Sequence, residues 1–316
     1  MLAFSTCWNS ARHLDGEAML QEIRDLGFEY AELGHGTRIS LVEGVLKAVD
    51  KGIIKICSVH NFCPLPPGRF DAAPNAYLFS AREQLEWDNA VRFTRNTIDF
   101  AQKIGAGVVV VHAGKVPVRK WTEKLLILTA QGKQQTPKYQ RVLERAISER
   151  ARHQPRYFAQ AIQCFHAIVP YAAERGIKIG VETRYAIEEI PDEAEAEEIL
   201  HMFPGETVGF WLDCGHAQVR QNLGIGSNFN WLQKFSSRLV GLHLHDVIAP
   251  GADHQPPGEG EVSFAQLAPY LSPEIPAVME LNPNAPLERV RASAERLKIL
   301  LRDAQNKAQT ADIVPQ

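Results

Sequence analysis

The sequence predicts a single-domain α/β protein, a (β/α)8 barrel, on the basis of three observations. Eight short apolar runs alternate with amphipathic stretches along most of the 316 residues, which is the number of strands that a closed parallel barrel requires. Several amphipathic stretches are followed by a glycine of the kind that ends helices, namely Gly27, Gly52, Gly105 and Gly176. Metal-ligand side chains stand at the ends of six consecutive runs. We expect the barrel to span residues 1–305.

The predicted strands are rich in Val, Ile and aromatic residues and are bounded by Gly, Pro or charge, which favours strands over buried helices. They cover residues 2–7, 30–34, 54–60, 107–112, 177–182, 208–213, 239–245 and 277–281. The helical patterns between them cover residues 16–27, 42–52, 80–104, 156–176, 192–203, 229–238 and 287–305. A helix between successive strands is typical of a parallel sheet.

Two segments depart from this alternation. Residues 114–155 form an insertion after the fourth strand, mixed in charge and predicted to be partly helical. The insertion either covers the mouth of the barrel or extends into solvent or an oligomer contact. The last residues, 306–316, are predicted to form a disordered tail.

The composition excludes several classes of protein. Hydrophobic residues make up 45% of the chain, charged residues 22%, and the formal net charge is −3, so no overall positive charge favours nucleic acid. The sequence shows no signal-peptide pattern and no apolar run long enough to span a membrane. Its five cysteines are scattered and odd in number, which argues against a disulfide framework. We expect a cytoplasmic protein that acts on a small molecule, either as a monomer or as a homo-oligomer.

Active sites of such barrels lie at the C-terminal ends of the strands. Strands three to eight carry a His, Asp or Glu at an inward-facing position at or near this end: His60, His112, Glu182, Asp213, His243 and Glu280. These residue types occupy about 15% of the sequence, so six such ends in succession are not expected by chance. Polar residues that merely mark where strands meet solvent do not explain the pattern.

This set of side chains points to a divalent metal. Carboxylates that converge on one pocket repel one another, whereas a divalent cation neutralises them. Mixed imidazole and carboxylate ligation suits Zn, Mn, Fe or Co more than Ca, and Mg less strongly. One ion is expected, and the number of histidines leaves room for a second.

At these residues the sequence resembles the xylose-isomerase-like barrel superfamily of sugar isomerases, epimerases and endonuclease IV. The matching segments are IGVETR, GFWLDCGHA, GLHLHDV, HQPPGEGEVSF and AVMELNP, and RDLGFEYAELG resembles the first helix and second strand of the family. The isomerase and epimerase members imply one metal held by Glu182, Asp213, His243 and Glu280. They also imply that Glu182 and Glu280 approach opposite faces of a bound sugar, and that His216 contacts substrate or a neighbouring ligand.

The endonuclease IV members imply a larger set of ligands, those of a three-zinc cluster. The additional histidines of that cluster would correspond to His60, His112, His216 and His254, which either hold a second metal or contact substrate. The aspartate of the same cluster would fall at position 252, where this chain has Ala252, and Asp253 is off by one. The resemblance to the trinuclear site is therefore incomplete.

Four further residues have two interpretations each. Arg184 faces the same side as Glu182 and either binds a substrate oxygen or phosphate or forms a surface salt bridge. His245 shares a strand face with His243, and the family pattern favours His243 as the ligand and His245 as a substrate contact. Glu32, in the middle of a strand, is interpreted as a buried structural carboxylate or a partner of a ligand. Cys214 is interpreted as packing rather than as a nucleophile.

The leading hypothesis is a metal-dependent isomerase or epimerase of a sugar, sugar phosphate or cyclitol. Glu182 and Glu280 would remove and return a proton through an enediolate, with His216 as an alternative acid. The rivals are an endonuclease IV-like phosphodiesterase and a lyase or hydrolase of modified sugars. A barrel that only binds a ligand is disfavoured by the complete set of four metal ligands.

Overall fold

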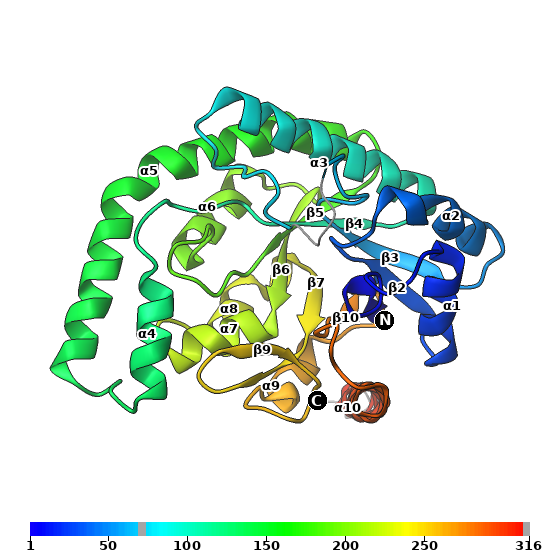
Figure 1. Cartoon of the computed structure of the whole chain (residues 1–316). Coiled ribbons are helices and arrows are strands. Elements are labelled where there is room, and N and C mark those ends of the chain that lie inside the picture. Colours follow the sequence, from blue (N-terminus) through cyan, green and yellow to red (C-terminus); the bar gives the residue numbers. More distant parts are fainter. Residues whose placement is uncertain (69–73, 312–316) are drawn as a thin grey trace.

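Eight parallel strands close into a barrel in the computed structural model, which describes residues 1–68 and 74–311 (Figure 1). The strands of the ring are β1 (Leu2–Ser5), β2 (Tyr30–Leu33), β3 (Lys55–His60), β4 (Val108–Val111), β5 (Lys178–Glu182), β6 (Val208–Asp213), β7 (Leu239–Leu244) and β10 (Ala277–Met279). They stand in chain order, and β10 pairs with β1 to close the ring. Each coincides with a predicted strand, so the predicted (β/α)8 fold is confirmed.

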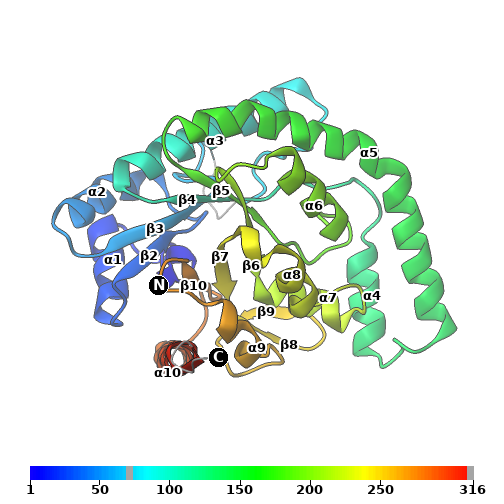
Figure 2. The same cartoon turned by 180° about the vertical axis from the view of Figure 1, so that it is seen from behind.

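Helices surround the ring on its outer side (Figures 1 and 2). Those expected from the sequence are α1 (Gly16–Asp25), α2 (Val42–Asp50), α3 (Gln84–Ile104), α6 (Glu193–Met202), α8 (Asn228–Phe235) and α10 (Leu287–Ala311). The four glycines predicted to end helices all have positive φ, between 66° and 84°, as that position requires. The helix α3 begins at Gln84 rather than at Ser80.

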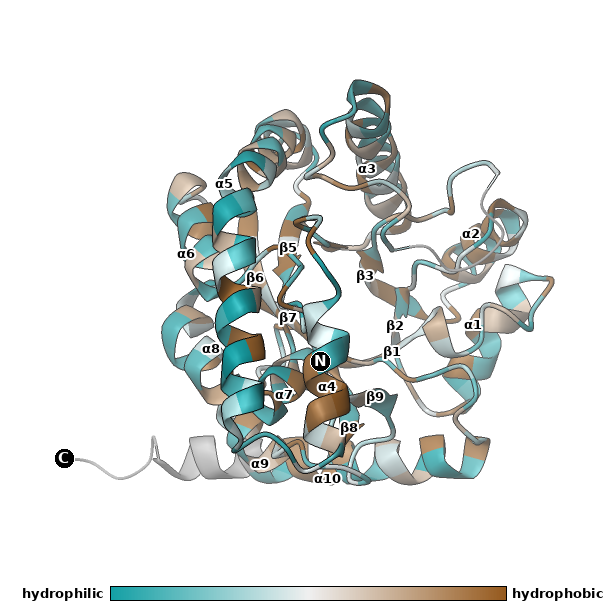
Figure 3. Cartoon of the chain, turned by 60° about the vertical axis from the view of Figure 1, so that its left-hand side comes forward, coloured by the Kyte–Doolittle hydropathy of each residue, from teal (hydrophilic) through white to brown (hydrophobic). Residues whose placement is uncertain are grey.

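The insertion does not form a separate unit, because its second half is continuous with a barrel helix. It contains α4 (Trp121–Ala130) and the first part of α5 (Pro137–Ala173), which continues without a break through the helix predicted at 156–176. In both cartoons α5 lies beside α3 and then extends past the ring, where α4 packs against it. The strongly apolar part of α4 is visible in Figure 3.

The structure contains three elements that the sequence pattern did not predict. They are α7 (Cys214–Asn222), the short helix α9 (Phe264–Leu267) and the hairpin of β8 (Asp246–Ile248) and β9 (Ala252–Gln255). The segment of α7 has no apolar stripe, and its first turn is capped by the side chain of Asp213, which accepts a hydrogen bond from the His216 backbone N–H. Both α7 and the hairpin follow strands that carry candidate ligands.

The C-terminal helix α10 continues to Ala311, past residue 306 where the disordered tail was expected to begin. Residues 312–316 lie outside the described part of the chain. Within the described residues, no helix combines the length and the apolar character needed to cross a membrane. All five cysteines are free thiols, in agreement with the expected lack of a disulfide framework.

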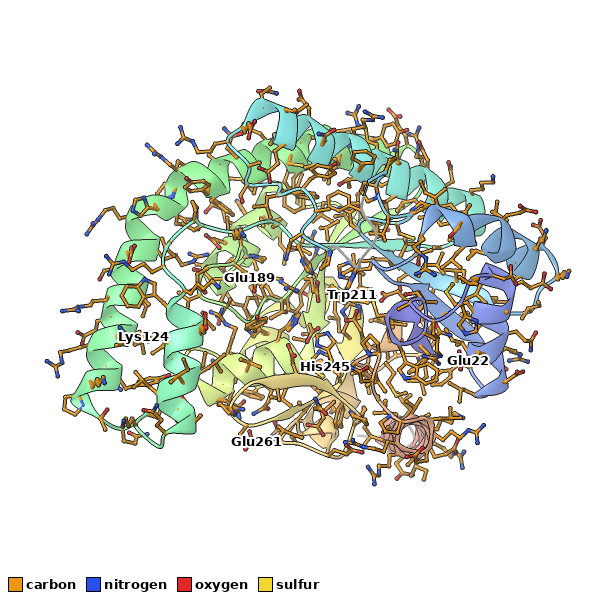
Figure 4. The ribbon with its side chains drawn as sticks, viewed as in Figure 1. Glu22, Lys124, Glu189, Trp211, His245 and Glu261 are labelled. Carbon is orange, nitrogen blue, oxygen red and sulfur yellow. The ribbon has the colours of Figure 1, made fainter. Side chains whose placement is uncertain are left out.

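Trp211 fills the interior of the barrel beneath the candidate site (Figure 4). Its ring is fully buried among Ala3, Val108 and Val278, and it lies edge-on to His243 with ring centroids 5.0 Å apart. The facing position on β7 is Gly241, where an added Cβ would lie 1.9 Å from a Trp211 ring carbon. The indole and this glycine are therefore a matched pair that forms the floor of the site.

We expect Gly241→Ala to destabilise the protein by roughly 1–3 kcal/mol, because a packed indole in a barrel cannot shift to admit the extra methyl group. The measurement is the free energy of unfolding in urea. Gly107→Ala is the matched control, since a Cβ at Gly107 meets nothing within 4 Å. An equal loss of stability in the two variants would contradict the proposed packing.

Candidate metal centre

Four side chains from neighbouring strands converge at the C-terminal end of the barrel, as the sequence predicted. Glu182 ends β5, Asp213 ends β6, His243 lies on β7 and Glu280 directly follows β10. One ligand atom from each lies within 4.8 Å of the others, and all four residues are buried. The register explains the convergence, because Asp213 and His243 are paired neighbours across β6 and β7.

The ring of His243 is oriented so that its Nδ1 atom faces the three carboxylates. Nδ1 lies 3.3 Å from Glu182 Oε1, 3.6 Å from Asp213 Oδ2 and 3.2 Å from Glu280 Oε2. Three carboxylate oxygens and one imidazole nitrogen thus surround one small volume. Such a set of atoms could hold a divalent metal, with Nδ1 as the nitrogen ligand.

The Nε2 atom of His243 faces Glu32. Of the two interpretations of Glu32, this contact favours a partner of a candidate ligand. Nε2 lies 3.2 Å from both carboxylate oxygens of Glu32, and this carboxylate also accepts hydrogen bonds from Ser5 Oγ (3.1 Å) and Ser58 Oγ (2.8 Å). Ser5, Glu32 and Ser58 are register partners on β1, β2 and β3. A carboxylate at Nε2 keeps the proton on that atom and leaves the Nδ1 lone pair for a metal.

We expect Glu32→Gln to lower the affinity for a divalent metal about 10–100-fold, because an amide can donate to His243 Nε2 and move the ring proton to Nδ1. The measurement is a calorimetric titration with Mn²⁺. Ser58→Ala, which removes one hydrogen bond to Glu32, should give a smaller loss. Unchanged Mn²⁺ affinity in folded Glu32→Gln would show that Glu32 has no part in orienting the ligand.

His245 occupies a different place from the substrate contact that the sequence suggested. It is fully buried, its Nδ1 accepts a hydrogen bond from the His254 backbone N–H (2.9 Å), and its Nε2 lies 2.9 Å from Asp213 Oδ1. Because Nδ1 is an acceptor, Nε2 carries the proton and donates to Asp213. His245 therefore contacts the candidate ligand Asp213, and both of its nitrogens are engaged. Its ring presses against Gly215, where an added Cβ would lie 2.0 Å from it.

A second group of ligand-type atoms shares Glu182. His60 Nε2 lies 3.4 Å and His112 Nε2 lies 2.7 Å from Glu182 Oε2, and both rings are buried. Arg184 reaches the same oxygen at 3.2 Å and lies 2.8 Å from His112 Nε2. The side chain of Arg184 is buried and bound by Glu189, so the alternative of a surface salt bridge is wrong. The sequence reasoning did not identify Glu189.

His216 and His254 lie on the opposite flank, around Asp213 and Glu280. His216 Nδ1 is 2.9 Å from the Thr183 carbonyl and 3.3 Å from Asp213 Oδ2, and its Nε2 is 3.9 Å from Asp253 Oδ2. His254 Nε2 lies 3.6 Å from Glu280 Oε2. Asp253, one residue after the position that the family pattern gives to an aspartate, therefore lies near His216 and beside His254.

A cavity of 440 Å³ opens onto Glu280 and His254. Its lining also includes Cys7, Ser10, His35 and Asn282. The ligand atoms of Cys7, His35 and Glu280 lie within 4.8 Å of one another. The pKa of His35 is lowered to about 3, mainly because the ring is buried and secondly because His60 lies nearby. Arg38, His254 and Glu280 add ionisable groups to the lining, and such a polar cavity beside a candidate ligand is suited to a small polyhydroxylated molecule.

The electrostatics of the four-ligand cluster fit a divalent cation. Burial opposes the charge of Glu182, yet His112 and Arg184 hold its pKa well below the usual range, and imidazoles lower the pKa of Asp213 in the same way. Burial also opposes protonation of His243, but Glu280 and Glu32 raise its pKa well above the usual value. In addition, the buried Oε2 atom of Glu182 makes no well-aligned hydrogen bond, despite its short distance to His112. The cluster is strongly anionic, and its atoms are those that Zn or Mn would bind.

The ring of eight parallel strands and this cluster of candidate ligands point to one family of barrels. The chain belongs to the xylose isomerase-like TIM barrel family, whose model matches residues 20–300. No curated protein matches its sequence.

Among solved structures, three similar ones are epimerases or are described as epimerase-like. A D-tagatose 3-epimerase-like protein is 18% identical with a TM-score of 0.67, and the match covers 97% of this chain and 99% of the other. An L-ribulose 3-epimerase is 12% identical with a TM-score of 0.68, covering 100% and 99%. The 3-keto-D-glucoside 4-epimerase of E. coli is 13% identical with a TM-score of 0.65, covering 94% and 98%. At these identities the likeness shows the fold alone.

Proposed function

We propose that the protein is a divalent-metal-dependent isomerase or epimerase of a sugar, sugar phosphate or cyclitol. The observation that carries the proposal is the convergence of three carboxylates on His243 Nδ1, at distances of 3.2 to 3.6 Å. Family membership supports it, and so does the structural similarity to an L-ribulose 3-epimerase and a 3-keto-D-glucoside 4-epimerase. The ion would be Mn, Zn, Co, Fe or Mg, held by Glu182, Asp213, His243 and Glu280.

Such an ion would act as a Lewis acid that acidifies the C–H bond between a carbonyl and a neighbouring hydroxyl. The residues of this chain would move the proton. Glu280 lines the cavity and is the group that a substrate in this cavity would meet first. Glu182 lies on the far flank, beside His112 and Arg184. One glutamate removes the proton and the other returns it, through an enediolate.

Three histidines are proposed to assist. His216 carries its proton on Nδ1, which faces the Thr183 carbonyl, so its Nε2 is free to accept a proton or bind a hydroxyl. His254 is partly exposed at the cavity, where it can contact substrate beside Glu280. His60 is bonded through Nδ1 to the Asn61 carbonyl and presents Nε2 toward Glu182.

The second candidate is a phosphodiesterase of the endonuclease IV type. The side chains around Glu182 and the contact between Asp253 and His216 favour it, because they provide places for further ions. The guanidinium of Arg184 among those side chains weighs against it. A lyase or hydrolase of modified sugars would use the same proton abstraction and is a variant of the leading proposal.

One experiment separates the two reaction classes. The Mn²⁺-loaded protein is incubated with a panel of ketoses in D₂O, and in parallel with a duplex that contains an abasic site. We expect deuterium at the carbon next to the carbonyl of at least one ketose, and no cleavage beyond that of the metal-stripped protein. Cleavage of the duplex without exchange in any ketose would overturn the proposal in favour of the phosphodiesterase.

A further inference from the structure

The second group of ligand-type atoms, around Glu182, has the geometry of another metal site. His60 Nδ1 is 2.9 Å from the Asn61 carbonyl, which can only accept, so that nitrogen carries the proton in the neutral ring. His112 Nδ1 is engaged in the same way by Asn75 Oδ1, at 2.9 Å. Both Nε2 lone pairs therefore face Glu182 Oε2, and the three atoms lie within 4.8 Å of one another. Lone pairs that converge in this way require a cation or a proton donor between them.

Arg184 supplies that donor. Its NH1 atom donates to His112 Nε2 at 2.8 Å and lies 3.2 Å from Glu182 Oε2, so its positive charge stands beside both atoms although it makes no well-aligned hydrogen bond to the carboxylate. A guanidinium keeps its proton in proteins, so it is a permanent donor and a permanent positive charge. The same NH1 lies 3.4 Å from His216 Nδ1, so the guanidinium extends into the space between the two flanks of the site.

The guanidinium is held in this place by several contacts. Its Nε and NH2 atoms donate to Glu189 Oε1 at 3.1 and 2.9 Å. The other oxygen of Glu189 accepts from the Ala186 backbone N–H, and the Glu189 carbonyl accepts from Arg150 on α5 at 2.9 Å. Arg150 also donates to the Ile187 carbonyl, at 2.6 Å. The helix that continues the insertion therefore fixes the loop that positions Arg184.

We propose that Arg184 takes the place of a second metal ion, so that the His60–His112–Glu182 group stays free of metal and the centre holds a single ion. A cation within bonding distance of His112 Nε2 and Glu182 Oε2 would compete with the guanidinium for the same lone pairs and be repelled by its charge. This inference rests on the proposed function, because it takes Glu182, Asp213, His243 and Glu280 as the site that is filled. It explains how a chain with seven histidines and three carboxylates that could serve as ligands can hold a single ion.

The test is the number of metal ions bound, which needs no substrate. The variant replaces both charges of the buried pair, Arg184→Met with Glu189→Gln, because removing one partner alone would leave an unpaired buried charge. Each protein is loaded with Mn²⁺, freed of excess metal and analysed for equivalents by mass spectrometry, and paired ions are detected from spin coupling in electron paramagnetic resonance. We expect one equivalent in the wild type and two in the double variant, with coupled spins.

Two further variants locate the second ion and control for lost stability. Adding His112→Ala to the double variant should return the stoichiometry to one. Arg238→Met is the matched control, since the Arg238 guanidinium donates to backbone carbonyls between Leu200 and Val208, away from the candidate metal centre. It should reduce stability and leave one equivalent bound.

The outcomes are distinct for this inference and for the proposed function. Two or more equivalents in the wild type, or a single equivalent in the folded double variant, would overturn the role of Arg184 and leave the four-ligand centre standing. No bound metal in the wild type would overturn the proposed function and this inference with it. Two equivalents in the double variant that persist after His112→Ala would also count against the inference, because the second ion would then lie elsewhere.

Discussion

Asp213→Asn is expected to abolish most metal binding while the barrel stays folded. The substitution removes one of three anionic ligands but retains a side-chain oxygen that can accept the His216 N–H at the start of α7. Loss of a direct ligand should lower the metal affinity by more than the roughly 10–100-fold that is typical when a residue that hydrogen-bonds to a ligand is replaced. Calorimetric titration with Mn²⁺ measures the affinity, and thermal unfolding measured by circular dichroism checks the fold.

Asp246→Asn is the matched control for this variant. Asp246 is equally buried but accepts hydrogen bonds from the backbone N–H groups of Val247, Gly258, Glu259 and Val262, and it contacts no ligand of the four-residue cluster through those bonds. We expect it to lower the melting temperature and leave Mn²⁺ affinity close to that of the wild type. If Asp213→Asn binds Mn²⁺ as tightly as the control does, Asp213 is not a ligand.

Glu280→Gln is expected to eliminate exchange of the substrate C–H hydrogen with solvent. The amide keeps the shape of the side chain but cannot take up a proton, and it also weakens the metal site by one charge. Loss of a positioned acid or base typically costs on the order of 10²–10⁴-fold in rate. The measurement is deuterium incorporation by NMR, for a ketose that the wild type exchanges and at Mn²⁺ concentrations that saturate the variant.

Saturation with metal separates the two effects of this substitution. If exchange recovers fully once Mn²⁺ is saturating, Glu280 is only a ligand and the proton is moved by another group, of which His216 is the first to examine. Glu22→Gln is the control, because Glu22 pairs with Arg12 and His13 at the start of the chain and does not belong to the metal cluster. It should exchange at the wild-type rate.

Strand periodicity was sufficient to predict the barrel and a row of His, Asp and Glu side chains at its strand ends, whereas the selection of four of them as candidate metal ligands came from the family resemblance. The alternation of inward and outward positions places Glu182, Asp213, His243 and Glu280 at the same end of four neighbouring strands, and the structure brings these four together. The tertiary contacts of Glu32 could not be derived in this way. A carboxylate in the middle of an apolar strand signals a buried partner, but only the closed ring brings β2 opposite β7.

The roles of His245, Asp253 and Arg184 could not be predicted from the sequence either, and the reason differs for each residue. His245 and His243 have the same strand face, and the choice between them depends on which nitrogen the surrounding groups leave unprotonated. Asp253 lies near His216 on the β8–β9 hairpin, an element that the residue pattern did not predict. Arg184 is positioned by Glu189 in a loop that Arg150 anchors from the insertion, a long-range contact with no signal in the sequence.

The central claim is that one metal ion lies among Glu182, Asp213, His243 and Glu280. The most direct test is a crystal of the wild-type protein soaked in Mn²⁺, with data collected for anomalous differences. We predict one strong peak, about 2.0–2.4 Å from a carboxylate oxygen of each acidic residue and from His243 Nδ1. No peak in the barrel mouth, or a peak coordinated by His245 while His243 is turned away, would contradict the account.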